Sequence, residues 1–262
     1  MRISYRHQNT KEYWTERWEN ISVDQPMENA DAYPLKYAEL TISAQGKILE
    51  AGCGAGRLLR YYKQRGYDIT GIDFIEHAIT KLKQADPDLQ VRTADIMDLP
   101  YPANTFRYVL SFGLLHNLEH GLSKAMQESY RVLQTGGKVC ASFRADNVQT
   151  RLSDWLAQSK RRGTNTRAAF HFHKRNLTRS EFVALFENAG FVVEAVYPVE
   201  NMPLLYRFPV FRAKYHKTFD ESRARVEGYK LTWVGAALQR LLMLFPESFC
   251  NLFVIIARKP GE

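Results

Sequence analysis

Residues 47–56 read Lys-Ile-Leu-Glu-Ala-Gly-Cys-Gly-Ala-Gly, and this stretch decides the fold. Its first apolar residues suit a short buried strand of a parallel sheet. Gly52, Gly54 and Gly56 then fall at alternate positions, where the missing Cβ lets the backbone turn tightly and lets a ligand lie against it. Apolar and aromatic residues follow at a helical period. The stretch therefore predicts a strand, a glycine loop and a helix N-terminus, which together form a nucleotide-type cradle.

Two acidic residues narrow the choice of ligand. Asp73 ends another apolar run about 20 residues after Gly52, a distance that places a carboxylate beside the ribose of a nucleoside. Glu50 lies two residues before Gly52. A dinucleotide-binding loop would read G-x-G-x-x-G, whereas this one reads G-x-G-x-G. Glu50 would repel a pyrophosphate but suits a ligand that carries an ammonium group.

At this point the chain resembles the class I S-adenosylmethionine-dependent methyltransferases, over roughly residues 45–143. Several marks occur in the family's order: the loop 50–56, Gly71-Ile72-Asp73, Ala94-Asp95-Ile96, Ser111-Phe112-Gly113-Leu114-Leu115-His116 and the turn 133–138. Several marks in order are more specific than any one alone. The resemblance implies S-adenosyl-L-methionine as cofactor and no metal. It also implies a doubly wound, mostly parallel seven-stranded α/β sheet of Rossmann-like type, whose last strand is antiparallel.

The resemblance also assigns cofactor-binding roles, which we state as expectations. Glu50, Gly52 and Gly54 would hold the methionine end, Gly56 would also belong to the cofactor-binding loop, and Asp73 would bind the ribose hydroxyls. The remaining expected contacts are Phe74 and Ile96 on the adenine, Asp95 at its exocyclic amine, and Ser111 or Phe112 near the sulfonium.

Hydrophobic periodicity predicts an alternating α/β chain folded as a single domain over residues 1–262. Strands are expected near 47–51, 68–73, 89–94, 106–112, 137–143, 191–197 and 249–257. Helices are expected near 55–66, 75–85 and 120–134. A further helix should begin at Thr178, with Glu181 as its capping-box partner. The methyltransferase core would span 45–145, preceded by an N-terminal helical cap, 1–40.

Composition and cysteine content indicate the size of the core and the cellular location of the protein. The 262 residues are 45 % hydrophobic, enough for one good core, and carry a net charge of +8. Three cysteines without metal-type spacing argue against a disulfide framework or a zinc site. The polar N-terminus lacks a signal-peptide core, and apolar runs are too short for a membrane span. We expect a cytoplasmic protein, with peripheral membrane contact as an alternative.

Two segments outside the core bear on the ligands. Trp14 and Trp18 are four residues apart and would share one helix face, similar to the leading helix with which thiopurine-type methyltransferases cover the cofactor. The alternative is simple anchoring of the helix. Residues 200–247 form an apolar insertion before the last strand. We expect it to act as an acceptor lid, the alternatives being packing on the core or a second copy in a homodimer, and a membrane-surface patch.

Residues 151–179 carry eight Lys or Arg against one acid, Asp154. Such a stretch could steer an anionic acceptor, a lipid head group or a nucleic acid, or be a solvated loop. Nucleic acid is disfavoured because no RNA-binding module is readable. The turn at 111–114 also lacks the Asn/Asp-Pro-Pro-aromatic pattern of base amino methylation.

The expected function is methyl transfer to a small or lipid-like acceptor, with oxygen weakly favoured over nitrogen, sulfur or carbon. A hydroxyl acceptor gains from a general base. The candidates are His171 and His173, which would point the same way if extended, and His116, for which a structural role is preferred. The alternatives are a non-catalytic cofactor-binding or membrane-associated subunit and an RNA methyltransferase.

Overall fold

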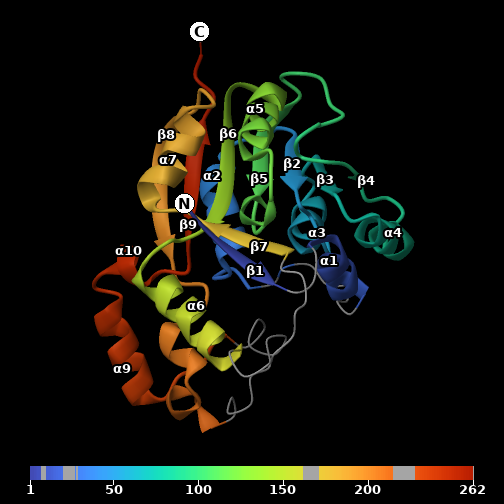
Figure 1. The fold of residues 1–262 in the computed structure, drawn as a ribbon. Coiled ribbons are helices and arrows are strands. Elements are labelled where there is room, and N and C mark those ends of the chain that lie inside the picture. Colours follow the sequence, from blue (N-terminus) through green and yellow to red (C-terminus); the bar gives the residue numbers. More distant parts are fainter. Residues whose placement is uncertain (7–9, 20–26, 28, 162–170, 215–227, 262) are drawn as a thin grey trace.

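The chain folds around a seven-stranded sheet (Figure 1). The structure is a computed structural model and describes residues 1–6, 10–19, 27, 29–161, 171–214 and 228–261. The strand order is β4-β3-β2-β5-β6-β9-β8, in which β9 alone runs antiparallel to its neighbours. The strands of this sheet are β2 (Ile48–Ala51), β3 (Ile69–Asp73), β4 (Val91–Thr93), β5 (Phe106–Ser111), β6 (Leu133–Arg144), β8 (Val192–Val199) and β9 (Leu252–Arg258).

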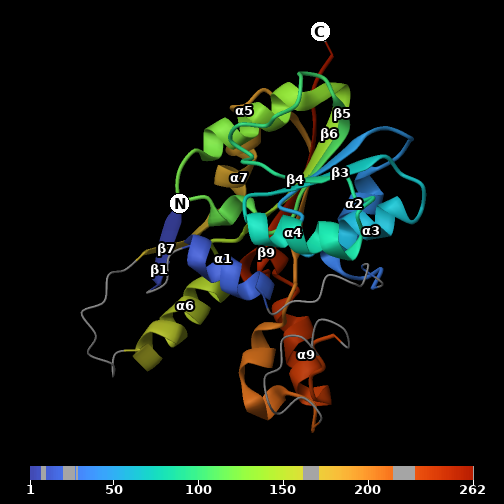
Figure 2. The same ribbon diagram turned by 90° about the vertical axis from the view of Figure 1, so that its right-hand side faces the viewer.

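Helices cover both faces of this sheet, as a turned view shows (Figure 2). Successive strand residues point to opposite faces, so Leu49 packs in one hydrophobic cluster and Ile48 in the other. The first cluster takes residues from α5 (Leu122–Val132) and α7 (Arg179–Glu187). The second takes residues from α2 (Tyr33–Thr41), α3 (Arg57–Lys63) and α4 (Glu76–Ala85). This doubly wound arrangement confirms the predicted fold class.

The core strands and helices lie close to their predicted places, with two boundary corrections. β6 begins at Leu133, so the predicted turn 133–138 is the irregular start of the strand, with Gly136 at φ 75°. β9 begins at Leu252, which leaves Cys250 at the end of the short helix α10 (Pro246–Phe249) instead of in a strand. All three cysteines are free and buried.

The N-terminal segment was expected to be helical, but it begins with a strand. Arg2–Arg6 form a strand, β1, which pairs antiparallel with β7 (His171–Asn176) in a separate two-stranded sheet. Only then come α1 (Thr10–Glu19) and α2. The pairing joins residues some 170 positions apart in the chain, which local periodicity does not predict.

The remaining elements frame the end of the sheet where the parallel strands finish. They are the short helix η1 (Leu115–Asn117), α6 (Val148–Arg161), η2 (Leu204–Arg207), η3 (Pro209–Phe211) and α9 (Trp233–Leu242). In both views α9 stands at the opposite end of the molecule from α5 (Figures 1 and 2). No helix within the described ranges is long and apolar enough to cross a bilayer.

Candidate cofactor and acceptor site

The glycine loop after β2 adopts the backbone that its sequence predicts. Gly52, Gly54 and Gly56 have φ values of 78°, 50° and 67°, in the left-handed region that favours glycine. The loop is fixed to the next strand, because the Gly52 N–H donates to the Ile72 carbonyl at 2.8 Å. The Gly54 N–H donates to Asp73 Oδ2 at 2.9 Å. The loop and the end of β3 therefore form one rigid unit.

Glu50 is buried at the end of β2, and its Oε2 has no hydrogen-bond partner among the described residues. Burial raises the pKa of its carboxyl to about 8, with the neighbouring Asp73 adding to the effect. A buried carboxyl of this kind is costly unless a partner meets it. The orphaned oxygen fits a ligand that brings an ammonium group.

Asp73 is also buried, but both of its carboxylate oxygens accept hydrogen bonds from backbone N–H groups. Its Oδ1 accepts the Ile75 N–H at 2.9 Å, opposite the bond from Gly54. Burial raises the pKa of this carboxyl, while these two N–H groups act to lower it. Asp73 is thus held in place by the backbone of the glycine loop and of the residues that follow β3.

The other residues expected at the adenine and the sulfonium surround this cradle. Phe74 is 56 % exposed, and Lys11 Nζ lies 5.9 Å from its ring centre. Asp95 Oδ1 accepts the Met97 N–H, and Ile96 is buried. The Oγ of buried Ser111 has no hydrogen-bond partner among the described residues, like the Glu50 oxygen.

Trp18 covers the glycine loop from α1. A Cβ placed on Gly54 would come within 2.5 Å of the Trp18 ring, so the indole lies where only glycine leaves room. Trp14 stacks behind it, with ring centres 5.7 Å apart and planes inclined by 23°. The helix α1 also packs beside α4. The two indoles share one face, as their spacing predicts.

A single cavity of about 1260 Å³ joins these residues to the insertion. Its wall includes Glu50, Gly52, Asp73, Phe74, Asp95, Ile96, Phe112 and Trp18 from the expected set. From the start of the insertion it takes Glu200 and Asn201, and beyond η3 it takes Gly228 and Tyr229. Pockets for one drug-sized ligand measure about 300–1,000 Å³. The cavity is therefore larger than one ligand needs.

Comparison with known proteins agrees with this geometry, since the family described as methyltransferase domain matches residues 49–141. The chain carries a class I S-adenosylmethionine-dependent methyltransferase domain. S-adenosyl-L-methionine is accordingly its cofactor. The matched residues run from β2 into β6 and include the glycine loop, Asp73 and Asp95.

Two curated relatives and one solved structure illustrate what the chain is similar to. Malonyl-[acyl-carrier protein] O-methyltransferase of Salmonella typhimurium is 33 % identical over 92 residues, which cover 35 % of this chain and 36 % of that one. Ubiquinone biosynthesis O-methyltransferase of Pseudomonas putida is 26 % identical over 199 residues, 71 % of this chain and 82 % of the relative. The fold matches a chain from the complex between the Haloferax volcanii Trm112 methyltransferase activator and a methyltransferase. The TM-score is 0.62 at 13 % identity, over 97 % of this chain and 99 % of that chain.

The alignments cover 57 %, 36 % and 48 % of the first three curated relatives, so the chain spans about half of their length. The family match, residues 49–141, covers the glycine loop, Asp73 and Asp95 but not the insertion. The part of the cavity that lies beyond the matched domain therefore has to be interpreted from the residues of this chain.

None of the three histidines expected as bases is among the described residues that line the cavity. His171 is exposed on β7, and His173 lies with its ring centre 6.5 Å from that of Tyr13. His116 packs on Phe143, and its Nδ1 is buried without a hydrogen-bond partner in the described part of the chain. Burial, followed by the charges of Arg144 and Lys174, holds its pKa well below the usual value. His120 does line the cavity, although it is mostly exposed.

The basic stretch is less free than its composition suggests. Arg151 is paired with Asp146, Lys174 with Asp154, and Arg179 with Glu247. The side chains of Lys160, Arg161, Arg162 and Arg167 lie outside the described part of the structure. The described cations of this stretch therefore tie α6, β7 and α7 to the rest of the fold. Among the residues that the structure places, no cluster of three or more His, Cys, Asp or Glu could hold a metal ion.

Sequence reasoning missed Tyr33 in the cavity wall and, near it, Arg144, which is not among the described residues that line the cavity. Tyr33, which begins α2, lines the cavity and meets Phe112 edge to face at 5.9 Å. Arg144 ends β6 close to Tyr33. A charged residue at the carboxyl end of a central parallel strand is a recognisable signal, since ligands of such sheets bind at that edge.

Proposed function

We propose that this chain transfers the methyl group of S-adenosylmethionine to a small acceptor bound in the same cavity. The observation that carries the proposal is the single cavity of about 1260 Å³, which runs from Glu50 and Asp73 to Glu200 and Tyr229. It exceeds the volume of one ligand. Cofactor at the glycine loop would thus leave room for an acceptor near the insertion.

The cofactor supplies an electrophilic methyl group on its sulfonium, and the residues present suit it. Glu50 would meet the ammonium group and Asp73 the ribose hydroxyls. Asp95, Phe74 and Ile96 would frame the adenine, with Ser111 or Phe112 nearer the sulfonium. The glycines Gly52, Gly54 and Gly56 would let the ligand approach the backbone, and Trp18 would exclude water above them.

We propose an oxygen acceptor in preference to nitrogen, sulfur or carbon. The named relatives include two O-methyltransferases, which supports this choice. Methyl transfer to an oxygen that is already ionised needs alignment more than a base. The absence of His116, His171 and His173 from the described cavity wall fits such an acceptor. A base role for His171 or His173 stays a prediction, which a drop in kcat of about 10²-fold in His171→Ala or His173→Ala would support.

Labelled methyl transfer tests the proposal. The chain is incubated with methyl-labelled S-adenosylmethionine and a cell extract, which is then separated into small molecules, lipid, protein and RNA. We expect label in the small-molecule or lipid fraction, and none with Glu50→Ala. Label in RNA would instead support an RNA methyltransferase. No transfer despite cofactor binding would support a non-catalytic subunit, and either result would contradict the proposal.

We also propose a peripheral membrane contact through α9. This helix buries polar Gln239, whose Nε2 donates to Glu200 Oε2 at 2.8 Å, and turns an apolar face outward. Trp233 is 83 % exposed, and Leu241, Leu244 and Phe245 are exposed beside it. Neighbouring exposed apolar side chains of this kind are typical of a surface that contacts a partner or a membrane. A second copy of the chain is the competing occupant.

A further inference from the structure

The helix α6 turns its polar side chains inward and an apolar stripe outward. Its buried polar residues are Gln149, Thr150 and Ser153. Val148, Leu152 and Trp155 are 55 %, 38 % and 63 % exposed. These three follow the helical spacing i, i+4 and i+7, so they share one face. A surface helix of a globular protein normally has the opposite arrangement, with its apolar stripe on the core.

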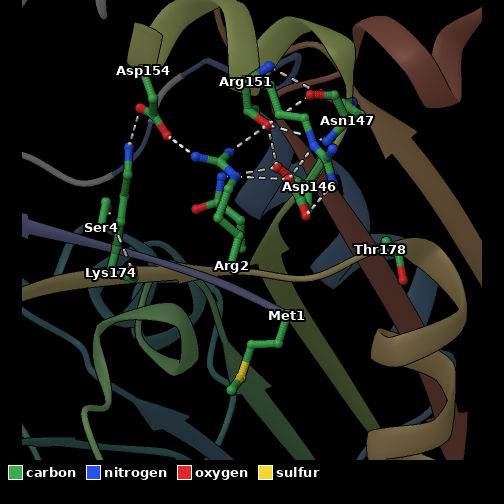
Figure 3. A network of polar contacts seen from close by, with 12 residues as sticks. Met1, Arg2, Ser4, Asp146, Asn147, Arg151, Asp154, Lys174 and Thr178 are labelled. Atoms are coloured by element: carbon green, nitrogen blue, oxygen red, sulfur yellow. Dashed lines mark hydrogen bonds and ion pairs between the residues drawn. The ribbon is translucent and has the colours of Figure 1, made fainter. Parts of the chain in front are cut away.

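Contacts with β1 and β7 hold the polar face of α6 inward (Figure 3). Arg2 of β1 donates to Asp154, and its Nη2 donates to Thr150 Oγ1 at 3.2 Å. Lys174 Nζ of β7 donates to Asp154 Oδ1 at 3.3 Å. Asp154 is the one acid in the sequence of α6. Because it is bound on the inner side, the outward stripe has no acidic neighbour on its own helix.

The stripe of α6 begins beside the end of the exposed apolar face of α9. Asn147, directly before α6, donates through Nδ2 to the Glu247 carbonyl of α10 at 2.8 Å and to the Cys250 carbonyl at 2.9 Å. Phe245, directly before α10, is 67 % exposed. Both α6 and α9 stand at the end of the molecule away from α5 in the two views (Figures 1 and 2). The two apolar faces therefore meet at α10.

Basic residues accompany this apolar surface. The run Lys160-Arg161-Arg162 closes α6 in the sequence, and Arg240 is exposed on α9, which has no acid in its sequence. The acid of α10, Glu247, is paired with Arg179 at 3.3 Å. Apolar side chains that include tryptophan, bordered by lysine and arginine, suit the surface of an anionic membrane. A two-fold dimer would instead bring this basic surface against itself.

We propose that α6 and α9 together form a docking surface for an anionic lipid membrane, with Trp155 and Trp233 entering the lipid interface. The inference goes beyond the contact proposed for α9, because it assigns a second helix and gives a role to the basic end of α6. The helix α6 follows β6 at the edge of the sheet where Asp73 ends β3. Docking would therefore hold the edge that carries the cavity near the lipid.

Co-sedimentation of the full chain with vesicles tests the inference. One kind of vesicle contains phosphatidylcholine alone, and the other contains phosphatidylcholine with phosphatidylglycerol. We expect binding to the mixed vesicles and weaker binding to the neutral ones, a difference that high salt removes. Leu152→Ser and Trp155→Ser should each weaken binding to mixed vesicles by about fivefold or more, since each removes an apolar contact with the interface. Leu40→Ser, at an exposed leucine of α2, is the matched control and should bind as the wild type does.

A charge variant separates the electrostatic part. Lys160→Gln combined with Arg161→Gln should remove the preference for mixed vesicles and leave binding to neutral vesicles unchanged. Vesicle binding that is absent in the wild type, or equal in wild type, Leu152→Ser and Trp155→Ser, would overturn the inference. If Trp233→Ser alone weakens binding, the contact belongs to α9 and the assignment of α6 is wrong.

Two further readouts identify a different occupant of the α6 stripe. A lower Tm in Trp155→Ser with unchanged vesicle binding would mean that the stripe packs against the chain itself. Dimers that Trp155→Ser abolishes, without vesicle binding, would assign the stripe to a second copy, and either result would contradict the inference. S-adenosylhomocysteine binding without vesicles, measured on the same variants, should equal that of the wild type. Failure of membrane docking is thereby distinguished from failure of the proposed methyl transfer.

Discussion

At the scale of single residues, Glu50 and Asp73 differ in how the protein satisfies them. Asp73 receives two backbone N–H groups, whereas one oxygen of Glu50 has no partner in the described part of the chain. Both positions could be predicted from sequence, because spacing from the glycine loop fixes where they lie. The missing partner of Glu50 could not, since burial and neighbours depend on the whole fold.

Glu50 should impose a pH dependence on the stability of the ligand-free chain. Burial raises its pKa from 4.5 to about 8, so the native state holds a proton that the unfolded state releases above pH 4.5. Stability should therefore fall as pH rises from about 5 to about 8, and then level off. Glu50→Gln should flatten this slope, while Glu76→Gln on the exposed start of α4 should not. Thermal unfolding across pH measures both, and equal slopes in Glu50→Gln and wild type would contradict the assignment.

Asp73 should govern cofactor affinity. Asp73→Ala should weaken S-adenosylhomocysteine binding by about 10- to 100-fold, because hydrogen bonds to a charged group contribute roughly 1.5–3 kcal/mol. Asp68→Ala, just before β3 and exposed, is the control. Calorimetry at neutral pH provides the comparison. An unchanged affinity in Asp73→Ala would place the ribose elsewhere.

At the scale of elements, local sequence signals predicted helices and strands well, whereas pairings between distant segments were not predicted. The helix start at Thr178 is confirmed with its complete capping box, since Thr178 and Glu181 are neighbours in sequence. The strand β1 was missed because its partner β7 lies some 170 residues further along the chain. The paired state of Lys174 and Arg151 was missed as well. Lys174 pairs with Asp154, 20 residues away in the chain, whereas Arg151 pairs with Asp146, only five residues before it, and composition alone shows neither pair.

The helix α1 should contribute to cofactor binding through Trp18. Because its indole covers Gly54, Trp18→Ala should lower S-adenosylhomocysteine affinity by about tenfold, the scale of an aromatic contact of roughly 1.5 kcal/mol. Trp155→Ala, on the 63 % exposed tryptophan of α6, is the matched control. If both variants bind as the wild type does, α1 is merely anchored to the core.

At the scale of the whole molecule, the cavity is lined both by the cofactor-binding core, which the sequence predicted, and by the insertion, whose role is harder to predict from sequence. The expected lid over 200–247 supplies Glu200, Asn201, Gly228 and Tyr229 to the cavity wall, whereas no residue of α9 lines it. Tyr206 is fully buried and Trp233 is not. Apolar composition alone could not predict which of the two side chains is buried, because both lie in similarly apolar sequence.

The exposed face of α9 should bind lipid without supporting the fold. Trp233→Ser should change the free energy of unfolding by no more than about 0.5 kcal/mol, as for most surface positions, but should reduce co-sedimentation with anionic liposomes. Tyr206→Ala, by contrast, should cost about 3–5 kcal/mol because it leaves a buried cavity. Concentration-dependent dimers that Trp233→Ser abolishes, without liposome binding, would assign the face to a second copy instead.

The central claim is that the cavity bounded by Glu50 and Asp73 is an S-adenosylmethionine site. Calorimetric titration of the chain with S-adenosylhomocysteine, beside an identical titration with NAD, tests it most directly. The account predicts one S-adenosylhomocysteine per chain with a micromolar Kd, about −8 kcal/mol, and no saturable binding of NAD. Saturable NAD binding without any binding of S-adenosylhomocysteine would contradict it.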